Sequence, residues 1–142
     1  MGHDHIINGC EQLHSLCMQF KISTKEKFTI IIPAGPELSA ILAVELQQSL
    51  LAFLSQEVKN VVLNLGEVNS VDRGAAELLV KVQQEFYDRN ASFVICCLTE
   101  AVETQLDEWG LLELMNSTPT ESEAWDIVQM EEIERDFLSG DD

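Results

Sequence analysis

The segment from Val61 to Val80 constrains the fold of this chain more than any other part. It reads VVLNLGEVNSVDRGAAELLV. An apolar run from Val61 to Leu65 is followed by a short polar link and by a helical pattern that starts near Ala75. This succession predicts a buried strand, a tight turn and a helix. In α/β sheets, functional groups gather where the carboxyl end of a strand meets the next helix, and Asp72 stands at that junction.

Asp72 is predicted to begin this helix. Its carboxylate can accept hydrogen bonds from the free N–H groups of the first helical turn, and its charge favours the positive end of the helix dipole. A catalytic role would need a nucleophile, an acid–base pair, a metal site or a cofactor loop. All three histidines lie near the N-terminus, and no phosphate-binding or dinucleotide-binding glycine motif is present. We therefore expect no enzymatic activity and no cofactor.

The rest of the chain alternates between strand and helix patterns. Strands are expected at 18–23, 28–32 and 92–98, helices at 39–56, 74–89, 100–109 and from the capping-box sequence at 120–123, and a short edge strand at 111–115. The apolar faces of the first and last helices are expected to include Ile41, Ile133 and Phe137. The order predicts an α/β fold, with a mixed sheet of four to five strands and about four helices. The sheet should combine an N-terminal hairpin with parallel strands.

A chain of 142 residues predicts one domain. We place that domain at 18–138, after a tail or short helix at 1–17 and before an acidic tail at 139–142. The alternative that Met18 is the native start stays open. The sequence has no apolar run of the roughly 18 residues that a membrane span needs, and no secretory signal, so a cytoplasmic location is expected.

The net charge is −17, from 25 acidic and 8 basic residues. Such a charge repels nucleic-acid phosphates and anionic lipid surfaces. It suits a basic protein partner, although acidity that serves only solubility carries equal weight.

The His and Cys residues do not form a recognisable metal pattern. Five of them lie close together in the sequence: His3, His5, Cys10, His14 and Cys17. Their spacing matches no zinc motif, so no metal is predicted. Cys96 and Cys97 are neighbours in a predicted strand, where adjacent side chains point to opposite faces. We expect them to be small core residues in a reducing compartment.

The segment around Asp72 resembles the signature of the STAS domain, the fold of bacterial anti-sigma factor antagonists. In that family an apolar strand ends in Asp, and Ser-Ser-Gly or Ser-Thr-Gly and a helix follow. Here Asp72 matches the Asp, Arg73 stands at the first hydroxyl position, Gly74 stands at the position that is phosphorylated in regulated members, and Ala75 replaces the glycine. The resemblance covers about residues 20–137.

The resemblance implies a regulatory protein that binds an anti-sigma factor or serine kinase through the loop and helix around Asp72, in bacterial transcription control. The candidate contact residues are Ser70, Asp72, Arg73, Gly74, Ala75 and Glu77. Gly74 has no hydroxyl, so the usual phosphorylation is lost. Ser70 is the nearest hydroxyl, and it is better explained as a loop residue than as a substitute target.

Several alternatives remain open at this point. Arg73 either holds an acidic group of a partner or pairs with Asp72 or Glu77, and local pairing is slightly favoured. Some STAS domains are accessory subunits of lipid-handling ABC transporters, and a small-ligand sensor is a third possibility. The sequence does not distinguish a monomer from a homodimer.

Overall fold

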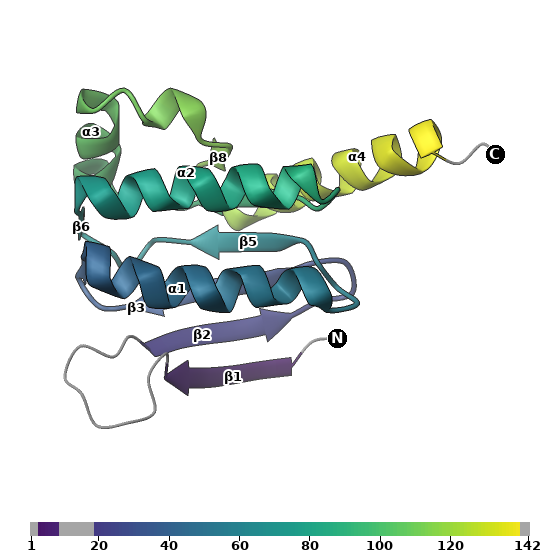
Figure 1. Ribbon diagram of the computed structural model, residues 1–142, viewed down its shortest axis with the longest axis horizontal. Helices are drawn as coiled ribbons and strands as arrows, with labels where there is room; N and C mark the ends of the chain where they lie inside the picture. Colours follow the sequence, from purple (N-terminus) through teal and green to yellow (C-terminus); the bar gives the residue numbers. More distant parts are fainter. Residues whose placement is uncertain (1–2, 9–18, 140–142) are drawn as a thin grey trace.

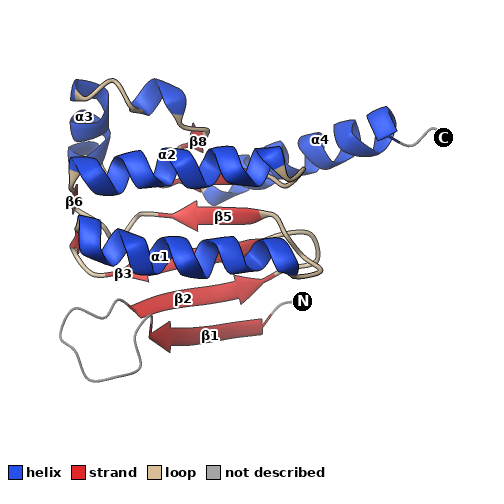
Figure 2. Cartoon of the chain, in the orientation of Figure 1, coloured by secondary structure: helices blue, strands red, loops and turns tan. Residues whose placement is uncertain are grey.

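The computed structural model describes residues 3–8 and 19–139, and these residues build three layers. A central sheet is covered on one face by α1 (Ala40–Ala52) and α2 (Arg73–Asp88), which lie side by side, and on the other by α4 (Glu121–Ser139) (Figures 1 and 2).

The main sheet has six strands in the order β1-β2-β3-β5-β7-β8. Their bounds are β1 His3–Asn8, β2 Gln19–Thr24, β3 Thr29–Ala34, β5 Val61–Asn64, β7 Phe93–Cys96 and β8 Ser117–Thr118. The first three strands are antiparallel, and the other pairings are parallel. The prediction of an α/β fold, in which a mixed sheet combines a hairpin with parallel strands, is confirmed. The sheet is one strand larger than expected because β1 pairs with the edge of β2.

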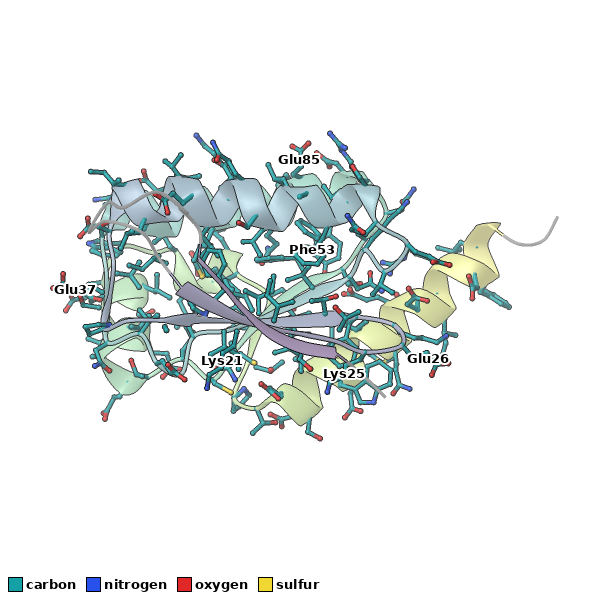
Figure 3. The ribbon with its side chains drawn as sticks, turned by 90° about the horizontal axis from the view of Figure 1, so that it is seen from below. Lys21, Lys25, Glu26, Glu37, Phe53 and Glu85 are labelled. Carbon is teal, nitrogen blue, oxygen red and sulfur yellow. The ribbon has the colours of Figure 1, made fainter. Side chains whose placement is uncertain are left out.

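The central strands are buried on both faces, as their continuous apolar sequences predict. One core cluster lies under α1 and α2 and contains Ile31, Leu63 and Ile95. The alternate residues of the same strands face α4 in a second cluster: Ile30, Val62 and Val94. Figure 3 shows Phe53 pointing from the end of α1 toward the sheet, whereas Glu85 of α2 points away from it.

The starts of α1, α3 and α4 follow local capping rules. Ser39 caps α1 by accepting a hydrogen bond from the N–H of Leu42. Thr99 caps α3 (Glu100–Glu108), and Thr120 Oγ1 accepts from the N–H of Glu123 at the start of α4, as the capping-box sequence predicts. A short 3₁₀ helix, η1 (Phe53–Ser55), follows α1.

Two predicted elements differ in the structure. Residues 3–8 form strand β1 and not a tail or short helix, because the free edge of β2 supplies the pairing that this segment alone does not signal. The predicted edge strand at 111–115 is wrong: this segment contains a 3₁₀ helix, η2 (Leu112–Leu114), and the edge strand is β8.

Three residues expected on apolar inner faces point outward. Ile41 is 59% exposed, because the buried face of α1 is formed by Ala43, Leu46 and Leu50. On α4, Ala124 and Val128 are buried, but Ile133 and Phe137 are exposed.

The predictions for residues 9–18 and 140–142, which include a start at Met18, lie outside the described residues. The domain boundaries stay a prediction. Within the described part, no helix has the length and apolar content needed to cross a membrane.

Candidate functional site

The candidate site is the loop that connects β5 to α2. After β5 ends, the chain forms a two-residue strand, β6 (Ser70–Val71), which pairs in parallel with β4 (Glu37–Leu38). Val68 and Val71 point into the core and are almost fully buried. The loop is therefore anchored by apolar side chains and by a small sheet of its own.

α3 holds the loop from a second side. The side-chain oxygen of Gln105 accepts a hydrogen bond from the N–H of Val71 at 3.0 Å. The hydroxyl of Thr99 donates to the carbonyl of Val68 at 3.2 Å. Sequence reasoning missed both supports, since a Gln on the polar side of a helix gives no signal that it reaches a loop backbone 34 residues away.

Asp72 joins the starts of α1 and α2. It is the N-cap residue of α2, but its side chain makes no capping bond within that helix, which corrects the prediction. Its carboxylate instead accepts a hydrogen bond from the backbone N–H of Ala40, the first residue of α1, at 3.1 Å. The backbone N–H of Asp72 donates to the carbonyl of Leu38 at 3.0 Å. Asp72 thus satisfies an N–H that α1 leaves without an intrahelical partner.

The residues after Asp72 form an exposed step. Asp72, Arg73 and Gly74 are exposed in succession, and Glu77 is exposed one turn later. The Arg73 Nε lies 3.4 Å from the Glu77 carboxylate, so the favoured local pairing is confirmed with Glu77 as the partner. Ala75 is fully buried, which means that its side chain supports the surface from below and is not part of it.

Gly74 leaves the start of α2 open. A Cβ added at Gly74 would lie 3.4 Å from the Cβ of Ala40, which is an ordinary van der Waals separation. Space therefore permits a small side chain at this position, and the absent hydroxyl is a property of the sequence and not of the packing.

Ser70 is poorly placed as a substitute for that hydroxyl. It is half-buried, it belongs to β6, and its N–H donates to the carbonyl of Pro36 at 3.0 Å. The backbone of Ser70 is therefore already paired with its neighbours.

Two apolar side chains extend the exposed surface onto α1. Ile41 and Val44 are 59% and 44% exposed, and Ile41 directly follows Ala40, which is bonded to Asp72. The sequence predicted Ile41 in the core because it adjoins a stripe of Leu residues with helical spacing. The structure shows instead that Ile41 and Val44 are exposed.

Two described titratable groups outside this loop, Tyr87 and Cys96, have clearly raised pKa values. Burial raises the pKa of Cys96, and the neighbouring Cys97 thiol adds to this shift. A thiol with a raised pKa is a weak nucleophile.

Cys97 follows the end of β7 with a φ of 63° and packs against the same core cluster as Cys96, so the prediction of opposite faces is wrong. Among the described residues, no three His, Cys, Asp or Glu side chains are grouped as a metal site.

Comparisons with known proteins agree on the architecture. The family model of the STAS domain matches residues 19–124. A putative anti-sigma factor antagonist from Thermotoga maritima has a TM-score of 0.69 at 22% identity, over 78% of this chain and 94% of that one. An anti-sigma factor antagonist from Mycobacterium paratuberculosis has a TM-score of 0.69 at 16% identity, over 82% and 97%. The Bacillus cell fate determinant SpoIIAA in its phosphorylated form has a TM-score of 0.56 at 16% identity, over 77% and 98%. No curated protein matches the sequence.

Proposed function

The chain belongs to the STAS domain family, and from this membership we propose that it is a non-enzymatic regulator of the anti-sigma factor antagonist type. Its partner is an anti-sigma factor with serine kinase character. The contact surface consists of Asp72, Arg73, Gly74 and Glu77, extended by Ile41 and Val44, and is called the Asp72 surface below.

The hydrogen bond between Asp72 and Ala40 is the observation that carries this proposal. It ties the start of α2 to the start of α1, and the small sheet of β4 and β6 fixes the loop in front of both. A surface that is already ordered loses little conformational entropy when a partner binds. The exposed residues of the Asp72 surface therefore stand on a rigid support, which is what a recognition site needs.

The chemistry of the Asp72 surface suits a protein partner. Ile41 and Val44 supply apolar area, while Arg73 supplies a cation in a chain whose net charge is −17. Interfaces combine an apolar centre with a charged or polar rim, and Arg is enriched at their energetic centres. Among the described residues, Arg73 pairs with the exposed carboxylate of Glu77 at 3.4 Å. Breaking this exposed ion pair costs little free energy, so Arg73 can pair with an acidic group of the partner instead.

Regulation by phosphate at the start of α2 is absent in this proposal. Gly74 offers no acceptor hydroxyl, and Ser70 is half-buried within a paired strand. Binding would then be controlled by the amount of this protein or by another signal, and phosphorylation by the partner would not dissociate the complex.

A binding titration tests the proposal. The partner is first isolated from the native organism on the immobilised chain, and its affinity is then measured by calorimetry for the wild type, Asp72→Ala and Arg73→Glu. We expect each substitution to weaken binding about tenfold or more, which is about 1.4 kcal/mol. Unchanged affinity in both variants, with an intact fold, would show that the surface is misplaced. Isolation of membrane transporter subunits in place of a kinase would move the protein to the accessory-subunit class.

A further inference from the structure

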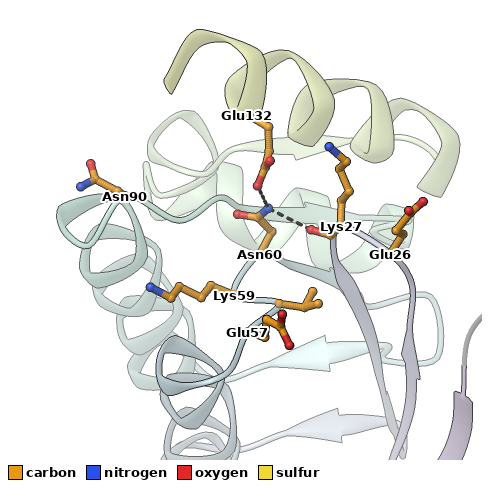
Figure 4. Close-up of a pocket in the computed structure, with 8 residues that line it drawn as sticks. Glu26, Lys27, Glu57, Lys59, Asn60, Asn90 and Glu132 are labelled. Atoms are coloured by element: carbon orange, nitrogen blue, oxygen red, sulfur yellow. Dashed lines mark hydrogen bonds between the residues drawn. The ribbon is translucent and has the colours of Figure 1, made fainter. Parts of the chain in front are cut away.

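The rotation of α4 about its axis is fixed by polar contacts on its inner side. Ser92 Oγ donates to the carboxylate of Glu131 at 2.6 Å, and the hydroxyl of Tyr87 donates to it at 2.8 Å. The carboxylate of Glu132 accepts from Asn60 Nδ2 at 2.7 Å (Figure 4).

Further contacts of Arg135 and Trp125 prevent this helix from turning. The Arg135 guanidinium donates to Ser92 Oγ at 3.1 Å and to Asn60 Oδ1 at 3.2 Å. Near the start of α4, the ring of Trp125 stacks on that of Phe28 with the ring centroids 4.7 Å apart. Rotating α4 to bury other side chains would break all of these contacts.

The outer side of α4 consequently presents an apolar stripe. Met130, Ile133 and Phe137 recur at helical spacing and therefore lie along one face. They are 57%, 66% and 83% exposed, and Leu138 beside them is 82% exposed. The last turns of α4 extend beyond the sheet, so the described part of the fold does not cover them (Figure 1).

Single exposed apolar residues are common on protein surfaces and need no explanation. Four exposed apolar side chains in the second half of one helix are different, because contiguous apolar patches mark interaction sites. The end of α4 also lies at the opposite end of the molecule from the start of α2, so the Asp72 surface does not account for the stripe (Figure 1).

Charge selects the occupant of the stripe. Asp126, Glu134 and Asp136 are exposed on or beside the stripe, whereas Arg135 lies on the inner side of the helix. A second copy of the chain would bring the same acidic rim and a net charge of −17 against it. An anionic lipid surface would be repelled in the same way.

We propose that the stripe of Met130, Ile133 and Phe137 is a docking surface for a basic amphipathic helix of a partner protein. The apolar side of such a helix covers the stripe, and its Lys or Arg residues meet the acidic rim on both sides. This surface is separate from the Asp72 surface, so the protein can contact two partner segments at once.

Fluorescence anisotropy with a labelled Leu/Lys peptide tests this inference. The peptide is designed as an amphipathic helix, and a scrambled peptide of the same composition controls for charge alone. The titrations use the full chain at about 0.15 M salt, where the Debye length is about 8 Å and long-range attraction is screened. We expect the amphipathic peptide to bind about tenfold or more tightly than the scrambled one.

Matched variants locate the binding. Ile133→Ser with Phe137→Ser should abolish the preference for the amphipathic peptide, whereas Ile41→Ser with Val44→Ser, which removes exposed apolar side chains from α1, should preserve it. All four positions are exposed, so both double variants should keep the fold.

Three outcomes would overturn the inference. Equal affinity for both peptides would mean that only charge is recognised. Self-association in light scattering that Ile133→Ser with Phe137→Ser removes would make a second copy the occupant. Co-sedimentation with phosphatidylglycerol vesicles that needs the same two side chains would assign the stripe to a membrane.

Discussion

The carboxylate of Asp72 accepts a hydrogen bond from the backbone N–H of Ala40 at 3.1 Å, so the residue that opens α2 also completes the first turn of α1. The first N–H groups of a helix have no partner within the helix. Asp72 supplies one from a second helix and thereby fixes the relative position of the two helix starts. The partner-binding surface proposed above depends on this link.

Replacing Asp72 tests the link directly. Asp72→Ala should lower the free energy of unfolding by about 1 kcal/mol, because the N–H of Ala40 loses its acceptor. Asp72→Asn retains an oxygen acceptor and should lie within about 0.5 kcal/mol of the wild type. Urea unfolding followed by circular dichroism measures both. Equal stabilities of the Ala variant and the wild type would mean that the bond contributes nothing in solution.

Gly74 offers a test of the open start of α2. Gly74→Ala should stabilise the protein by about 0.5–1 kcal/mol, because Gly is a poor helix former and the added Cβ meets only Ala40 at 3.4 Å. Thermal unfolding measures the gain. A loss of stability would show that the two helix starts are packed more tightly than this separation indicates.

The same position tests the loss of phosphate control. Gly74→Ser restores a hydroxyl at the helix start, so incubation with the partner kinase and ATP should add one phosphate at that residue. The wild-type chain should gain none. Intact-mass and peptide mass spectrometry distinguish the two proteins, and phosphate on Ser70 of the wild type would contradict the proposed absence of this switch.

Tyr87 should make stability depend on pH at the alkaline end. Burial raises the pKa of Tyr87, and its hydrogen bond to Glu131 adds to the shift. In the unfolded chain the phenol loses its proton near pH ~10, whereas in the folded chain it keeps it to higher pH. The unfolded state then binds fewer protons than the folded state, so stability falls as the pH rises past about 10.

Tyr87→Phe isolates this contribution. At neutral pH the variant should be less stable than the wild type by about 1 kcal/mol, because Glu131 loses a donor. Above pH ~10 the difference should shrink, since only the wild type has a phenol that resists ionisation. The raised pKa of Cys96 acts in both proteins and cancels in the difference. A gap that stays constant from about pH 7 to 11 would rule out this role for Tyr87.

Asn60 should be the most sensitive polar residue of the fold. It is 3% exposed, it donates to the carbonyl of Lys27 and to Glu132, and it accepts from the N–H of Ser92. Asn60→Ala removes all of these bonds and leaves the buried N–H of Ser92 without its acceptor, so it should cost about 2–3 kcal/mol. Asn69→Ala, in an exposed loop position, should cost less than about 0.5 kcal/mol. Similar urea midpoints for the two variants would contradict the role of Asn60 in holding α4 on the sheet.

Local rules made much of the fold predictable. The apolar run at Val61, the cap residues Thr99 and Thr120, and the left-handed Asn90 after α2 all act within a few residues of where they stand. Sequence patterns report such short-range effects well. Strand, turn and helix therefore fall where the segment around Asp72 predicts them.

Long-range partners were not predictable in the same way. Asp72 has the residue type and position of a cap for its own helix, but its acceptor is used by Ala40, 32 residues earlier. Ile133 and Phe137 have the spacing of a core face, but Glu131 and Arg135 find partners on α2 and beside β7 that turn this face outward. Which of two faces a helix buries depends on groups that only the folded chain brings together.

Arg73 and Arg89 provide a matched pair of positions with which to test whether the Asp72 surface binds the partner. Both lie at ends of α2, and each pairs with a Glu one turn away, Glu77 and Glu85, at 3.4 and 3.0 Å. Arg73→Glu and Arg89→Glu therefore make the same charge change at opposite ends of one helix.

The most direct measurement is quantitative affinity capture from a lysate of the native organism with three baits: the wild type, Arg73→Glu and Arg89→Glu. We expect that a serine kinase of the anti-sigma factor class is recovered with the wild type and Arg89→Glu, and that its recovery falls about tenfold or more with Arg73→Glu. Equal recovery of that kinase from all three baits would contradict the claim that the start of α2 is the binding surface.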